Sequence, residues 1–196
     1  MTFMNAKALA VTAALLLGST AAIAECDERL EIDTEQVRDH LALLKSPDAD
    51  ELDQIDVLGP LLCAKRESVR DLAFRAGLAS PSRAVQAETL LAAMKRKRTM
   101  VVEFVEEEDI SSDVRAYIKD TIAVDYQLNH VEDESCAGLD TNRQCKSYFV
   151  DIHGNQVEIT YGRDLGSFSL DESGELKGFF KPANLSAKVP ARIKLL

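Results

Sequence analysis

Hydrophobic residues in the first half of the chain recur at the spacing of an amphipathic helix. Asp33 and Gln36 resemble a capping box, and Val37, Leu41 and Leu44 then fall on one helical face. A Ser-Pro pair follows and ends the pattern. This stretch therefore predicts a helix that begins near residue 33 and buries one side.

Three more helices are predicted before residue 98. The second runs from about Asp50 to Leu62, and Gly59-Pro60 is expected to kink or divide it. The third has an apolar stripe with i, i+3, i+4, i+7 spacing, formed by Val69, Leu72, Ala73 and Ala76. The fourth is expected to have Ser80 as its cap and Pro81 at its first position.

The pattern changes between residues 99 and 135, which we interpret as a mixed connector. The β-branched run from Met100 to Val105 predicts a strand, and Ser111 or Ser112 could cap a short helix after it. One more helical pair is the alternative for this region.

Apolar and polar residues alternate in the last part of the chain, residues 136–196. Gly154-Asn155 predicts the turn of a hairpin. Later strands are expected at 167–170, 176–180 and 191–195. The fold class is thus α+β, with a small antiparallel meander, either a sandwich or a partly closed barrel, after the helical part.

Two helical segments resemble each other. "VRDHLALLKSP" begins at Val37 and "VRDLAFRAGLASP" begins at Val69, and both end in Ser-Pro. A period of roughly thirty residues made of two short helices is typical of α-solenoids. Residues 33–98 resemble a HEAT-type repeat on this evidence, and the resemblance implies protein interaction through a concave face. An ordinary four-helix bundle fits the same pattern, so the helical unit, residues 25–98, is HEAT-like by resemblance alone.

The first 24 residues have the features of a secretory signal peptide. Lys7 precedes an apolar run, and the small residues Ala22 and Ala24 predict cleavage after Ala24. Glu25 stands where a lipoprotein would have a small residue before the modified Cys26, so we do not expect a lipid anchor. The mature chain is expected to be periplasmic or secreted, with no membrane insertion.

Four cysteines in an exported chain suggest two disulfides. Cys136 and Cys145 flank a short polar segment and are the first expected pair. An antiparallel helical hairpin would bring the start of its first helix beside the end of its second, so Cys26 and Cys63 are the second. No Cys-x-x-Cys redox motif is present in the sequence.

The net charge of -10 argues against binding to nucleic acid or to anionic lipid. The cluster Lys95-Arg96-Lys97-Arg98 is the local exception. We interpret it as cations that stabilise a helix C-terminus, and an acidic run begins soon after it at Glu106.

Catalytic, metal and cofactor motifs are not found in the sequence. His40, His130 and His153 are scattered without a zinc-ligand spacing. "GSFSL" from Gly166 lacks the second glycine of a nucleophile elbow, and the turn at 171–175 lacks the spacing of a calcium loop. We therefore assign no catalytic, metal-binding or cofactor-binding residue.

These observations favour a non-catalytic exported protein that binds a protein or glycan partner in the cell envelope. One alternative is an envelope hydrolase that uses carboxylates to act on glycan or peptide. Another makes the β domain a carbohydrate-binding module with an exposed aromatic row. The aromatic residues that could form such a row are Tyr148, Tyr161, Phe168, Phe179 and Phe180.

Overall fold

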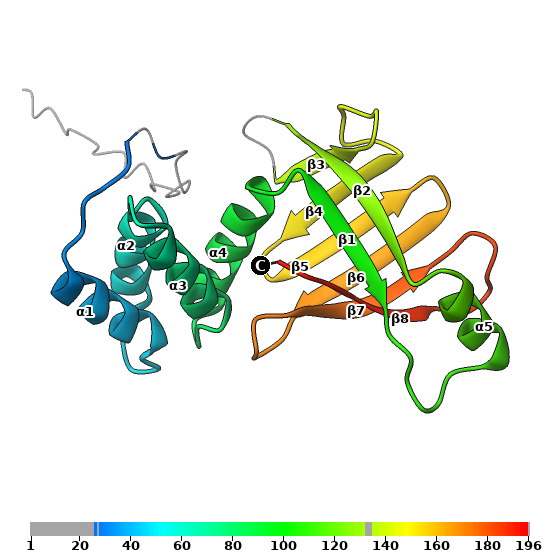
Figure 1. The fold of residues 1–196 in the computed structure, drawn as a ribbon, viewed down its shortest axis with the longest axis horizontal. Helices are drawn as coiled ribbons and strands as arrows, with labels where there is room; N and C mark the ends of the chain where they lie inside the picture. The colour runs from blue at the N-terminus through cyan, green and yellow to red at the C-terminus, as the bar shows by residue number, and fades with distance from the viewer. Residues whose placement is uncertain (1–25, 27, 132–134, 196) are drawn as a thin grey trace, which may run out of the picture.

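A computed structural model describes residues 26, 28–131 and 135–195. A helical unit stands at one end of a β-barrel, and one further helix lies at the barrel's other end (Figure 1). The predicted signal peptide, residues 1–24, lies outside the described residues. The α+β class is confirmed.

The helical unit consists of two consecutive hairpins, one formed by α1 and α2 and the other by α3 and α4 (Figure 1). Its core is continuous across both hairpins and includes Leu44, Leu58, Val69 and Val85. Two stacked hairpins are found in a short solenoid and also in a small four-helix bundle. The HEAT-type resemblance therefore stays a prediction. The bounds are α1 (Thr34–Lys45), α2 (Glu51–Leu62), α3 (Glu67–Leu78) and α4 (Arg83–Lys95).

The local helix predictions hold in part. Asp33 caps α1, since its side chain accepts the N–H of Gln36 at 2.9 Å. α2 is not divided at Pro60. Pro60 lies in the last turn of α2. Its missing N–H therefore removes only one backbone hydrogen bond, to the carbonyl of Asp56, and the helix continues to Leu62. Leu72 was wrongly placed on the buried stripe of α3, because its side chain is 50% exposed.

Ser82, and not Ser80, caps α4. The Ser82 hydroxyl accepts the N–H of Val85, whereas Ser80 is buried and its hydroxyl donates to the carbonyl of Leu44 at 3.0 Å. Ser80 therefore joins the loop before α4 to the end of α1, and this contact is not visible in a local cap pattern.

The strands form one closed antiparallel barrel in chain order, not a sandwich of two sheets. β1 pairs with β2 and also with β8, where Val102 lies opposite Ile193 and closes the sheet. Segment 99–135, interpreted above as a connector, contributes β1 and β2 to this barrel, and α5 (Ser112–Asp120) lies between them. The strands are β1 (Thr99–Phe104), β2 (Ala123–His130), β3 (Cys136–Leu139), β4 (Tyr148–His153), β5 (Gln156–Tyr161), β6 (Asp164–Leu170), β7 (Leu176–Lys181) and β8 (Val189–Ile193).

Alternate side chains fill the interior of the barrel. On β5, for example, Val157 and Ile159 are buried while Glu158 between them is exposed. The predicted turn at Gly154-Asn155 joins β4 to β5, with Gly154 at a φ of 58°. The same apolar cluster extends through the whole barrel, so its centre is a packed core and not a channel.

Two disulfides join the pairs that the sequence predicts, Cys26 with Cys63 and Cys136 with Cys145. Beside the first, Leu30 donates its N–H to the Cys63 carbonyl and accepts the N–H of Lys65, so the segment before α1 is held along the end of α2. Disulfides of this kind are typical of chains that fold in oxidising compartments. In the described residues no helix has both the length and the apolar character needed to cross a membrane.

Candidate binding site between helices and barrel

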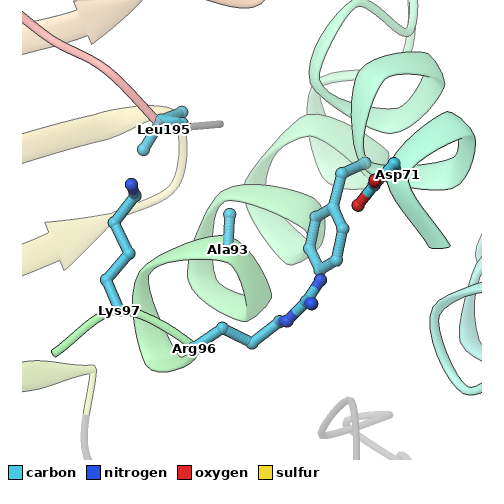
Figure 2. A pocket seen from close by; sticks show the side chains of 6 residues that line it. Asp71, Ala93, Arg96, Lys97 and Leu195 are labelled. Carbon is cyan, nitrogen blue, oxygen red and sulfur yellow. The ribbon is translucent and has the colours of Figure 1, made fainter. Parts of the chain in front are cut away.

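Two surface hollows lie where the helical unit meets the barrel. The first has a volume of about 240 Å³ and the second about 360 Å³, and Leu195 lines both. We call the two together the junction groove. The first hollow, shown in Figure 2, is lined by Asp71, Phe74, Ala93, Arg96, Lys97 and Leu195. The second is lined by Arg75, Ser173, Gly174, Glu175, Arg192, Ile193, Lys194 and Leu195.

The groove forms because helical residues enter one end of the barrel core. Leu78, Leu90 and Met94 are almost fully buried and belong to the same apolar cluster as the barrel interior. The turn between β6 and β7 also approaches α3, and a Cβ on Gly174 would lie 3.1 Å from the Cβ of Leu78. Gly174 has a φ of 81°, so a side chain there would be strained as well as crowded. These contacts fix the walls of the groove.

Alternation along the end of β8 supplies one of those walls. Ile193 and Leu195 are buried, whereas Arg192 and Lys194 point outward. Both cations bind Glu103 of β1, with Arg192 Nε at 3.0 Å and Lys194 Nζ at 2.7 Å from its carboxylate. Hydrogen bonds from Lys194 and Arg192 lower the pKa of Glu103. Much of the positive charge on this wall is thus already paired.

The opposite wall comes from the C-terminal end of α4. Arg96 is the C-cap residue, and its guanidinium lies 4.6 Å from the ring centre of the buried Phe74. This is a cation–π contact, which leaves the charge free to attract an anion. In Figure 2 the Lys97 side chain extends toward Leu195.

Lys97 is a partly buried cation of the groove. Its backbone carbonyl is 2.7 Å from His130 Nε2, which ties this residue to β2. Burial lowers the pKa of the Lys97 ammonium, because the charged form loses contact with water. Among the described residues, Lys97, Arg96 and Arg75 form no ion pair. Arg75 and Arg96 are exposed to solvent, so of the three only Lys97 is partly buried.

The two hollows do not bring carboxylates together in the manner of a hydrolase. Asp71 lines the first and Glu175 lines the second. A pair of carboxylates in one cleft, with the pKa of one raised by burial, would have favoured the hydrolase alternative. Glu88 on α4 does have a pKa raised by burial, but it lines neither hollow.

The structure places the three histidines apart. His40 is on α1 with its Nδ1 buried and without a hydrogen-bond partner, His130 contacts the Lys97 carbonyl, and His153 pairs with Asp151 at 2.8 Å. Across residues 28–131 and 135–195, together with Cys26, no group of three or more metal-binding side chains is found.

The segment at 171–175 forms a turn closed by its own side chains. Asp171 accepts hydrogen bonds from the backbone N–H groups of Ser173 and Glu175 and also pairs with Lys177. Burial acts to raise the pKa of Asp171, but the hydrogen bonds from Lys177 and Ser173 outweigh it and hold that pKa well below its usual value. These contacts occupy the carboxylate without a metal ion.

The five aromatic residues considered for a carbohydrate site do not form one exposed row. Phe168 and Phe180 are buried in the barrel, while Tyr148 is 44% and Phe179 is 49% exposed on β4 and β7. Tyr161 is partly exposed, and its ring stands at 82° to that of Tyr148 at a centroid distance of 5.0 Å. A flat stacking platform for a sugar is not formed by these rings.

Tyrosines gather instead at the barrel end that lies away from the helical unit. We call Tyr117, Tyr126, Tyr148 and Tyr161 the tyrosine cluster. A hydrogen bond to Asp140 raises the pKa of Tyr161, and burial, assisted by the charge of Asp164, raises the pKa of Tyr126. The rings of Tyr126 and Tyr161 are 5.2 Å apart, so they pack against each other.

Comparison with known proteins finds no matching protein-family model, no similar curated protein and no similar solved structure. The groove must therefore be interpreted from its own residues. The sequence indicated part of it, since the cluster at 95–98 is an unusual basic run in an acidic chain. We had interpreted that run only as the complement of a helix dipole. Arg75 and Lys194 carried no local signal, because only folding brings them beside it.

Proposed function

We propose that this protein is an exported, non-catalytic interaction module of the periplasm or the extracellular space, and that it binds its partner in the junction groove. The observation that carries the proposal is that helices and barrel each contribute lining residues to both hollows. A site made by both halves explains why the two are joined by a shared core. The HEAT-type resemblance of the helical hairpins supports the same role.

The packed barrel supports a binding role at its surface. Ligand-carrying barrels need an open interior, whereas Val150, Ile159 and Phe168 here are at most 1% exposed and belong to one filled core. The hollows of the groove open to the surface and are lined by several cations and by Asp71 and Glu175, which suits a polar interface with a macromolecule.

The proposal can be tested by capture of partners from the envelope of the source cell. The exported full chain is compared with the double variant Arg75→Glu, Lys97→Glu, which reverses one charge in each of the two hollows. A matched control, Arg163→Glu with Lys181→Glu, reverses the same charges at exposed positions near the other end of the barrel. We expect a partner that is captured by the wild type and the control but lost from the groove variant. Capture that is equal for all three proteins would exclude the groove as the binding site.

A further inference from the structure

We draw no further inference here: the strongest candidate, the patch of half-exposed apolar side chains that Leu165 and Phe179 form on the outer face of β6 and β7, is an unpartnered sheet face, and nothing in the structure shows what covers it.

Discussion

At one end of the barrel, Leu78, Leu90 and Met94 of the helical unit enter the core, whereas at the other end α5 places Val114 and Tyr117 over the strands. Both ends exclude water from the barrel, yet their polar groups differ. The helical end has two hollows, lined in part by Arg75, Arg96 and Lys97. At the α5 end, the phenol of Tyr161 is hydrogen bonded to Asp140 and its ring packs between two other tyrosine rings.

The difference separates a surface suited to binding from one suited to stability. Where polar groups are already bonded to one another, a ligand must displace those bonds and gains little. Hollows that both units line leave room for a ligand, and the two hollows described above are at the helical end. This is why the groove, and not the tyrosine cluster, is the candidate site.

The largest expected effect concerns the helical end of the barrel. Leu90→Ala should lower the free energy of unfolding by about 2–5 kcal/mol, because Leu90 is 0% exposed within the shared core. Urea unfolding of the exported chain measures the change. Leu165→Ala is the control, since this leucine is 50% exposed on the outer face of β6, and it should change stability by no more than about 0.5 kcal/mol. Equal costs for the two variants would mean that the helices do not close the barrel.

A second effect should appear at the tyrosine end in alkaline solution. Burial raises the pKa of Tyr126 in the folded protein, whereas an unfolded tyrosine has a pKa of about 10. Between these values the unfolded chain has lost its proton and the folded chain has kept it, so stability falls as the pH rises above about 10. The fall should reach at most about 1.4 kcal/mol per pH unit from this residue.

Tyr126→Phe cannot ionise at this position and should show a weaker alkaline loss of stability. Thermal unfolding between about pH 8 and pH 11 compares it with the wild type. Tyr148→Phe is the matched control because it also removes one phenol but leaves Tyr126 in place. If the two variants follow the same alkaline profile, the Tyr126 phenol is not protected by the fold.

A smaller effect is expected from the hydrogen bond within the cluster. Tyr161→Phe removes the hydroxyl that donates to Asp140 and retains the ring contacts with Tyr126 and Tyr148. The free energy of unfolding should decrease by about 0.5–1.5 kcal/mol. Urea unfolding near neutral pH measures it. The same variant should capture the same partner as the wild type does, and a loss of capture would contradict the separation of the two ends.

Local chemistry explains which parts of the fold were predictable. The cap formed by Asp33 and the turn at Gly154 depend on residues close in sequence, and the structure has both. Pairing of β1 with β8 joins residues as far apart as Val102 and Ile193, and no local pattern specifies such closure. This is why the sequence could not separate a sandwich from a barrel.

β2 was missed for a different reason. Its alternating Val124, Tyr126 and Leu128 are visible in the sequence, but they directly follow the predicted short helix and the segment had been interpreted as part of a connector. The groove was harder still, since its lining comes from α3, the end of α4, the β6–β7 turn and the end of β8. A basic run can mark one wall of a site, while its other walls depend on tertiary packing.

The smallest expected effect concerns the ion pairs at the end of β8. Glu103→Gln removes the carboxylate that binds Arg192 and Lys194 and keeps a side chain of nearly the same shape. Because ion pairs near the surface are weakened by water, the free energy of unfolding should fall by no more than about 1 kcal/mol.

Urea unfolding at low and at physiological salt measures this loss, which should shrink as the salt concentration rises. Asp164→Asn is the matched control, because it removes one carboxylate at the tyrosine end that forms no ion pair with a described residue, and its effect should not depend on salt. An equal salt dependence in both variants would show that only net charge matters. In that case the ion pairs of Glu103 would not stabilise the end of β8.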